Sequence, residues 1–483
     1  MKSDLSIKAV APMLLWGLLP LLGLLLLLYL RPAFFRDPLI LGSLILIEIV
    51  LASLWHYEKL YFPLTMVTFV LAGADISFEG AALTARWLVL GVGALAGAAI
   101  WIRGERHSLN AFHLAAFLCV PAATVSAIES NDPKTALLKV ASLFLLFLYC
   151  STGVRIAISG RETNFMQGLL LGCEITVFGT GLLYAAGWAF WYNPNSLGAV
   201  IGVAVTPFLL WGFLISETRA EKYRRGFGLL MCLILLFVSV SRASILAALV
   251  SSIALCICLR RQRLLIEGTF LIVLILAVAA VVAPTHFEQF SMNISNDLFY
   301  KGKKEKGMFG SRQGPWQETV TSLKQHPWFG TGFGTSSLSA KGQQVASLSV
   351  LEGVYTKDGT NREHGNSYLA LAEYLGFLGM IPFTFLIFLV VRMVINVCLW
   401  MRRTSNARHY AVPLSMLLLG GLVHAFFEDW LLAVGYYLCM FFWACAFLLD
   451  DVMPERRALR FAAASPAHPR ATSPVAAETI PST

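Results

Sequence analysis

The chain has 483 residues, of which 57% are hydrophobic and only 13% are charged. Soluble globular domains carry roughly 25% charged residues, so this composition excludes an ordinary soluble domain and indicates a protein that folds in lipid. The formal net charge is +9. Its basic residues cluster in short segments between apolar blocks, which favours a role in membrane topology over nucleic-acid binding.

Apolar blocks recur along the chain, each long enough to cross a bilayer as a helix. The first, residues 11–30, is too long for the apolar core of a signal peptide and lacks a following A-x-A pattern, so we interpret it as an uncleaved helix. We predict an all-α polytopic membrane protein with about 12 to 14 transmembrane helices. The candidate spans are centred near residues 20, 46, 67, 93, 120, 144, 176, 206, 233, 251, 274, 384, 418 and 440.

Basic residues mark alternate connections between these blocks, and the short connections between them are poor in base. The positive-inside rule then places both termini in the cytoplasm and the long segment 284–366 on the outer side of the membrane. The connection with Arg31 and Arg36 fits this pattern less well. The basic connections carry Arg103 and Arg106; Arg155 and Arg161; Arg219, Lys222, Arg224 and Arg225; Arg260, Arg261 and Arg263; and Arg402, Arg403 and Arg408.

Three regions follow from this pattern. Residues 1–225 form N-terminal transmembrane helices, and residues 226–450 hold further helices together with the outer loop 284–366. Residues 451–483 are rich in Ala, Pro, Ser and Thr, which predicts a disordered cytoplasmic tail. All nine cysteines lie in or beside apolar blocks and none lies in the loop, so neither a disulfide framework nor a thiolate metal site is indicated.

The outer loop is far longer than an ordinary connection, and we expect it to be partly helical. Pro315 suits the first position of a helix, and Pro327 would end it. Apolar residues between them fall at i, i+4 and i+7, which predicts one apolar helix face made of Trp316, Val320 and Leu323.

A glycine-rich segment follows this predicted helix, with Gly330, Gly332 and Gly334 at alternate positions. A phosphate-binding loop would follow a strand and carry a lysine. Here the glycines follow a helix stop and no lysine comes next, so we interpret them as turn residues.

Two arginines are candidates for chemistry. Arg242 is the only base in a tight hairpin between two apolar blocks, where it either marks a site or extends to the membrane surface. Arg312 precedes the predicted loop helix and is either a site residue or a solvated loop base. Two converging guanidinium groups would suit a pyrophosphate, because each grips phosphate oxygens through two hydrogen bonds.

His364 closes the outer loop just before an apolar helix, for which Asn366 or Ser367 is a natural N-cap. A helix N-terminus disfavours the imidazolium, so we expect a neutral ring at pH 7, as a general base requires. The alternative is a structural histidine that bonds to backbone. Glu428 and Asp429 form an acidic pair in the last outer connection, where they either orient a polar acceptor or mark the membrane interface.

Several segments of this sequence, taken in their order along the chain, resemble the family of O-antigen ligases and polymerases, which are bacterial envelope glycosyltransferases. The resemblance covers roughly residues 226–430 and departs at one place. The family usually has Asn, Ser or Gln directly after the histidine, whereas here Gly365 comes between His364 and Asn366. The matching segments are Ser241-Arg242-Ala243-Ser244, Arg312 before Trp316, residues 326–334, and His364 with Tyr368, Leu369, Glu373, Gly376 and Gly379.

The resemblance implies an enzyme of the bacterial inner membrane. It would move a glycan from undecaprenyl pyrophosphate to an acceptor hydroxyl, on lipid A–core or a growing glycan, at the periplasmic face. Arg242 and Arg312 would hold the pyrophosphate and stabilise it as leaving group, and His364 would take the acceptor's proton. Asn366, Glu428 and Asp429 are further substrate-binding candidates. The transfer would be inverting and use no metal or other cofactor, and the loop has no Asp-x-Asp pair.

Ligase and polymerase share these motifs, so the choice between them stays open. A polysaccharide flippase is the alternative from another class, but it should show internal repeats and interrupted helices in matching positions. No such repeat is present in the sequence. A membrane scaffold without enzymatic activity would leave the motifs unexplained.

Overall fold

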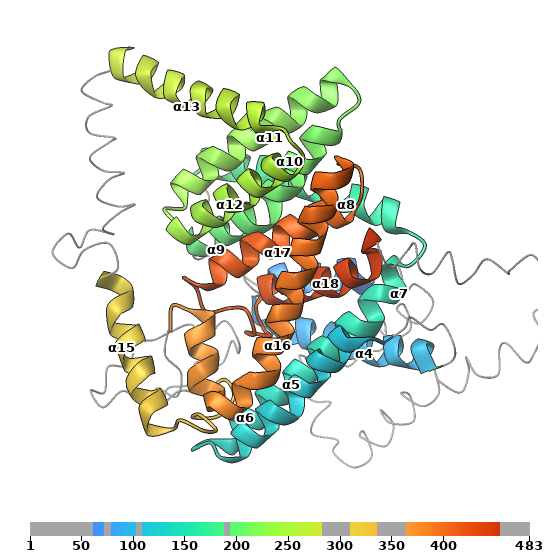
Figure 1. Ribbon diagram of the computed structural model, residues 1–483, viewed down its shortest axis with the longest axis vertical. Helices are drawn as coiled ribbons and strands as arrows, with labels where there is room; N and C mark the ends of the chain where they lie inside the picture. Colours follow the sequence, from blue (N-terminus) through green and yellow to red (C-terminus); the bar gives the residue numbers. More distant parts are fainter. Residues whose placement is uncertain are drawn as a thin grey trace, which may run out of the picture.

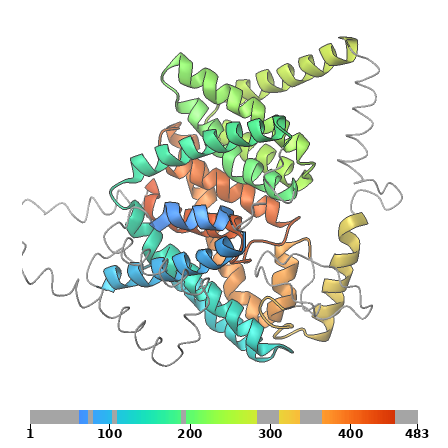
Figure 2. The same ribbon diagram turned by 180° about the vertical axis from the view of Figure 1, so that it is seen from behind.

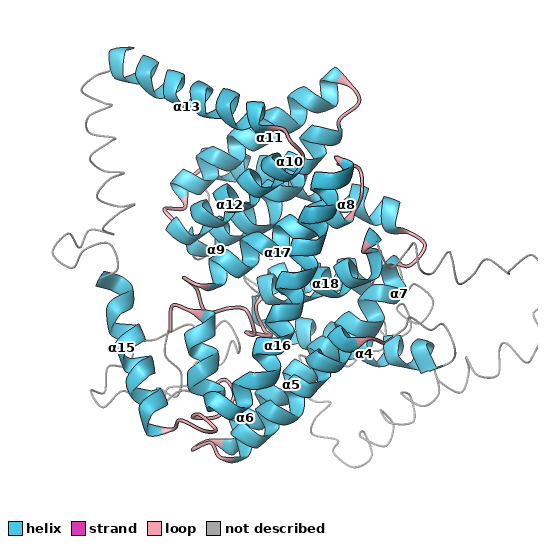
Figure 3. Cartoon of the chain, viewed as in Figure 1, coloured by secondary structure: helices cyan, strands magenta, loops and turns pink. Residues whose placement is uncertain are grey.

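The computed structural model describes residues 61–71, 79–102, 109–187, 194–282, 310–335 and 364–454. Within these ranges the chain is helical and has no strand (Figure 3). The candidate spans near residues 20 and 46, most of the outer loop and the tail beyond residue 454 lie outside the described residues. The all-α polytopic prediction is confirmed.

Every predicted span centre within the described ranges lies in a helix. Five of these helices are long and apolar enough to cross a membrane: Ala111–Ile128, Pro133–Ile158, Glu162–Ala185, Asn195–Ile215 and Ser367–Thr404. The described elements are α3 (Tyr61–Leu71), α4 (Glu79–Ile102), α5 (Ala111–Ile128), α6 (Pro133–Tyr149), η3 (Cys150–Val154), α7 (Arg155–Ile158), α8 (Glu162–Ala185), α9 (Pro194–Ala199), η4 (Val200–Val205), α10 (Thr206–Ile215), α11 (Arg219–Val238), α12 (Arg242–Cys258), α13 (Gln262–Val282), α15 (Gly310–Gln325), α16 (Ser367–Thr404), α17 (Ala411–Ala425) and α18 (Tyr437–Val452), where η marks a π-helical stretch.

Helix starts follow local capping chemistry. Asn110 begins α5 by accepting from the backbone N–H groups of Phe112 and His113, and Asp132 begins α6 by accepting from Thr135. Asn366 begins α16 in the same way. Such side-chain oxygens satisfy donors that have no partner within the helix, so these boundaries are set by the residues beside them.

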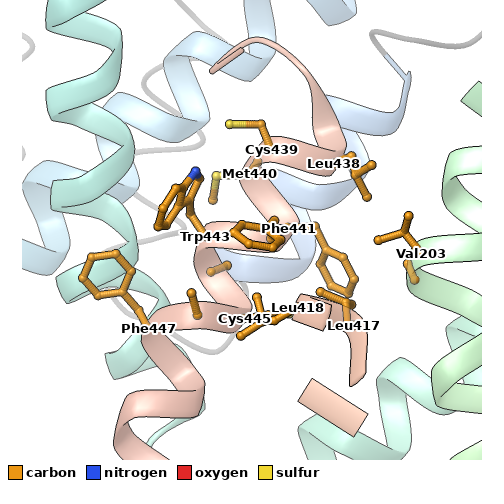
Figure 4. Close-up of a cluster of buried hydrophobic side chains, with 14 of the residues drawn as sticks. Val203, Leu417, Leu418, Leu438, Cys439, Met440, Phe441, Trp443, Cys445 and Phe447 are labelled. Atoms are coloured by element: carbon orange, nitrogen blue, oxygen red, sulfur yellow. The ribbon is translucent and has the colours of Figure 1, made fainter. Parts of the chain in front are cut away.

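Helices α17 and α18 occupy the centre of the bundle (Figure 1). Figure 4 shows Phe441, Trp443 and Phe447 of α18 and Leu417 of α17 in one cluster of hydrophobic side chains, and all four are buried. Large apolar side chains on the outer helices point outward instead, as expected where the surrounding solvent is lipid. Examples are Leu114, Leu182, Phe377, Ile381 and Phe388.

The long helix α16 is broken near its start. Gly376 has φ 61° and ψ −174°, which separates a short arm from the long remainder of the helix. The segment after α15 pairs with the backbone groups that the break releases: Thr331 and Gly332 donate to the carbonyls of Glu373 and Tyr374. The glycines of this segment all have positive φ, which confirms that they are turn residues.

Helix α15 packs beside the short arm of α16, and Figures 1 and 2 show this pair from both sides. It begins at Gly310, so Arg312 lies in its first turn and Pro315 lies inside it, not at its start. The predicted apolar face is confirmed only in part. Trp316 and Leu323 are half-buried, but Val320 is exposed. Among the described residues of this helix, Thr319 and Ser322 are the fully buried ones.

A cluster of buried and half-buried polar side chains lies where the start of α5 meets the end of α18. Arg155 donates to both carboxylate oxygens of Asp451, at 2.5 and 2.6 Å, and to Nε2 of His113 at 2.8 Å. Asn110 bonds to Asp450. Because α18 continues to Val452, the predicted tail boundary at residue 451 falls inside a helix.

Candidate active site

Three segments that are distant in sequence meet at one end of the bundle. They are the first turn of α15, the residues just before α16, and residues 426–436 between α17 and α18, which we call the site connection. Ser367 ties two of them together: its hydroxyl donates to the carbonyl of Glu428 and accepts from the N–H groups of Trp430 and Leu431. The site connection is therefore held against the start of α16.

Arg312 and Arg242 lie together beside the site connection. Nη2 of Arg312 donates to Oε1 of Glu428 at 2.5 Å, and both side chains are partly exposed. The charges of Arg312 and Glu428 act on Arg242, so these three side chains lie near one another. Two guanidinium groups thus converge beside one carboxylate, an arrangement with more positive than negative charge that suits an anion.

His364 is fully buried between two carboxylates. Nδ1 lies 2.8 Å from Oδ2 of Asp429, and Nε2 lies 3.1 Å from Oε2 of Glu373. Burial lowers the pKa of His364, but the hydrogen bonds and charges of Asp429 and Glu373 outweigh it and raise the pKa from 6.5 to about 9. The ring therefore carries a proton on both nitrogens at neutral pH.

The expectation of a neutral His364 is wrong for this reason. The helix N-terminus is present as predicted, but a helix end acts more weakly than two carboxylates in direct contact within a buried space. An imidazolium with both nitrogens engaged accepts no proton. Any base at this site is then one of the carboxylates. Of the two that contact His364, Asp429 has 23% of its side chain exposed, whereas Glu373 is fully buried.

The structure gives a reason for Gly365, the residue at which this sequence departs from the family pattern after the histidine. Its φ is 63°, a conformation that favours glycine. A Cβ at this position would overlap with Nη1 of Arg312. The missing side chain thus lets the guanidinium of Arg312 approach the backbone beside His364.

Asn366 lies next to this contact and caps α16. Its Oδ1 accepts from the N–H groups of Tyr368 and Leu369, at 2.8 and 3.1 Å, and the residue is 8% exposed. The predicted N-cap is confirmed. The proposed contact of Asn366 with substrate stays a prediction. In the structure its side chain caps the start of α16 at the site.

Two residues of the site were not identified as site residues from the sequence. Glu373, named only within a family motif, is a carboxylate in an apolar helix, and His424 lies in the apolar helix α17 beside the site connection. Ionisable residues inside apolar helices are costly and usually functional, which is the signal that would have found both. Across the described ranges, no group of three or more His, Cys, Asp or Glu side chains is arranged to hold a metal ion.

Comparison with known protein families identifies one region of the chain. Residues 227–384 match the model of the family described as O-antigen ligase, which identifies this region as a domain of that family. The match includes Arg242, Arg312 and His364, whereas Glu428 and Asp429 lie beyond it. No curated protein matches the chain. A multi-pass membrane protein with such a domain is a glycosyltransferase-like enzyme.

Proposed function

Because residues 227–384 form an O-antigen ligase domain, we propose that this protein transfers a glycan from undecaprenyl pyrophosphate to an acceptor hydroxyl of lipid A–core. The transfer takes place on the periplasmic face of the bacterial inner membrane. The observation that carries the proposal is the convergence of Arg242 and Arg312 beside the buried His364 and the exposed edge of Asp429.

The two arginines bind the donor's pyrophosphate. Each guanidinium has five N–H groups in a planar fork, a geometry that matches phosphate oxygens. Glu428 holds Arg312 in place, and the two guanidinium groups with this one carboxylate leave a net charge of +1 that attracts the anionic pyrophosphate. As the bond to the sugar breaks, the pyrophosphate keeps the electron pair, and the arginines stabilise this charge.

The acceptor hydroxyl is deprotonated at Asp429. The hydroxyl oxygen attacks the anomeric carbon on the face opposite the pyrophosphate, a new glycosidic bond forms, and the proton passes to a carboxylate oxygen of Asp429. The imidazolium of His364 lies behind this carboxylate and fixes its orientation through the 2.8 Å contact. The products are the glycosylated acceptor, with inverted anomeric configuration, and undecaprenyl pyrophosphate.

Purified protein in liposomes tests the proposal. With an undecaprenyl-pyrophosphate-linked glycan and lipid A–core, we expect the glycan to appear on the core and free undecaprenyl pyrophosphate to accumulate. A flippase would instead move intact donor across the bilayer without forming a glycosidic bond, and that outcome would exclude transferase activity.

A deletion strain separates ligase from polymerase. Loss of a ligase leaves long glycan chains on the lipid carrier that are not attached to the core. Loss of a polymerase leaves single repeat units, both on the carrier and on the core. We expect the first pattern, and the second would reassign the acceptor to a growing glycan.

A further inference from the structure

A buried chain of hydrogen bonds runs from the site connection to the start of α12. The indole Nε1–H of Trp430 donates to Nδ1 of His424 at 2.7 Å, and Nε2 of His424 lies 3.1 Å from Oγ of Ser244. Ser244 in turn lies 2.7 Å from the hydroxyl of Ser241. All four side chains are at most 3% exposed.

The donor at one end of this chain determines the tautomer of His424. An indole N–H only donates, so Nδ1 of His424 must accept and carries no proton. The proton of the neutral ring is then on Nε2, where it is donated to Ser244. A neutral ring also suits the surroundings, because His424 is buried, which disfavours a charged ring, and the positive charge of Arg312 would repel an imidazolium.

This series of hydrogen bonds joins two of the segments that carry charged groups of the site. Trp430 directly follows Glu428 and Asp429, and Ser241 and Ser244 flank Arg242 at the start of α12. The turn before Arg242 is held by a further serine, Ser239. Val240 has φ 50°, a conformation that is strained for a β-branched residue, and the N–H of Ser241 donates to Oγ of Ser239.

Neighbouring backbone prevents this chain from shifting. A Cβ on Gly198 of α9 would lie 2.5 Å from Cβ of Ser241 and 2.9 Å from Oγ of Ser244. The two hydroxyl groups are thus packed directly against another helix. A side chain at position 424 that cannot donate to Ser244 leaves a buried hydroxyl without this partner and loosens the turn that carries Arg242.

We propose that His424 is a positioning residue that, through Ser244 and Ser241, sets the guanidinium of Arg242 relative to Arg312 for binding the donor's pyrophosphate. This inference rests on the proposed function and deepens it. His424 touches no substrate in this scheme; it acts through Arg242. The same chain explains why serines stand on both sides of the arginine in Ser241-Arg242-Ala243-Ser244.

A double-mutant cycle tests the proposal, with undecaprenyl pyrophosphate in detergent as the probe and its dissociation constant as the readout. His424→Leu should weaken binding about 10-fold, a coupling typical of residues within one network. In the Arg242→Ala background it should cause no further loss, because the residue through which it acts is gone. In the Arg312→Ala background the 10-fold loss should remain.

Two further variants keep the test decisive. His424→Gln carries an amide that accepts from Trp430 and donates to Ser244, so binding should return to within about 3-fold of wild type. Ser244→Ala breaks the chain with a smaller change, and it replaces His424→Leu in the cycle if that variant fails to fold.

Equal losses in the wild-type and Arg242→Ala backgrounds would overturn the proposal and make His424 a packing residue. An unchanged dissociation constant in both His424→Leu and Ser244→Ala would overturn it as well. If the wild-type protein does not bind undecaprenyl pyrophosphate at all, the proposed function fails and this inference fails with it. These outcomes are distinguishable from one another.

Discussion

Two polar networks of similar composition lie at opposite ends of the bundle. The first, which we call the closed network, consists of Asn110, His113, Arg155, Asp450 and Asp451. The second, the site network, consists of Arg312, His364, Glu373, Glu428 and Asp429. Asn110 lies at the start of α5, and the other end of α5 lies beside the glycine-rich turn that contacts α16. Helix α5 has 18 residues, so its two ends are roughly 27 Å apart.

The two histidines differ in what surrounds them. His113 accepts from Arg155 through Nε2, since a guanidinium only donates, so its ring is neutral. His364 lies between two carboxylates and is charged. In the closed network Arg155, His113 and Asp450 are buried, and Asp451 keeps 15% of its side chain exposed. In the site network Arg312, Glu428 and Asp429 keep 13%, 19% and 23% of their side chains exposed. Residue type alone therefore does not identify a site. A network closed to water stabilises the fold, whereas an open network is accessible to a ligand.

The largest effect should come from opening the closed network. Arg155→Met removes the partner of Asp451 and a donor to His113, and breaking a buried ion pair costs about 3–5 kcal/mol of the free energy of unfolding. Thermal unfolding in detergent measures this loss. Arg408→Met, which removes an exposed arginine paired with Glu217, is the matched control and should leave stability almost unchanged. A stable Arg155→Met protein with impaired transfer would reverse the assignment of the two networks.

Arg312→Ala should affect activity more than stability. The rate of glycan transfer should fall about 100- to 1000-fold, as when one donor that stabilises developing negative charge is lost. The melting temperature should fall less than in Arg155→Met, because both partners of the Arg312–Glu428 pair reach water, whereas the side chain of Arg155 is fully buried. Arg312→Lys should restore little of the rate, since an ammonium lacks the planar fork. Wild-type transfer by the lysine variant would rule the pyrophosphate role out.

Gly365→Ala should separate the effect of backbone strain from the effect of moving the guanidinium of Arg312. Its methyl group overlaps with Arg312 and would push the guanidinium away, so transfer should fall about 10- to 100-fold. Gly160→Ala is the matched control, since Gly160 also has positive φ, at 73°, but has open space around its Cβ position. Equal effects of the two variants on transfer would show that backbone strain, not the position of Arg312, is responsible.

The charge of His364 predicts a specific dependence on pH. Because the pKa of His364 in the folded protein is raised from 6.5 to about 9, its contribution to stability is fully present below pH 6.5 and is lost as the pH rises through about 9. The difference in melting temperature between the wild-type protein and His364→Gln should therefore shrink between pH 6.5 and 9. A difference that stays constant over this range would mean that the ring is neutral.

The smallest expected effect is that of chelation. Transfer should continue at an unchanged rate in EDTA, because the proposed chemistry uses arginines to stabilise the leaving pyrophosphate. A matched reaction with added magnesium provides the control. Activity that is lost in EDTA and restored by magnesium or manganese would contradict metal-independent transfer.

The sequence by itself determined the features that depend on neighbouring residues. Apolar blocks located every described span, because a helix in lipid satisfies its own backbone groups and needs only enough apolar length. The cap at Asn366 and the turn glycines after α15 followed from local chemistry in the same way. The order of arginines, histidine and glycines also sufficed to indicate the family that residues 227–384 match.

Only the tertiary structure decided how the charged groups are paired. Asp429 is 65 residues beyond His364 in the chain, and no local pattern shows that it reverses the effect of a helix N-terminus. Arg155 served in the sequence as a marker of the cytoplasmic side, yet it is 1% exposed and bound to Asp451. Electrostatic energies depend on distance and burial, which the fold sets, so the same side chain is a solvated base, a structural tie or a site residue according to what packs against it.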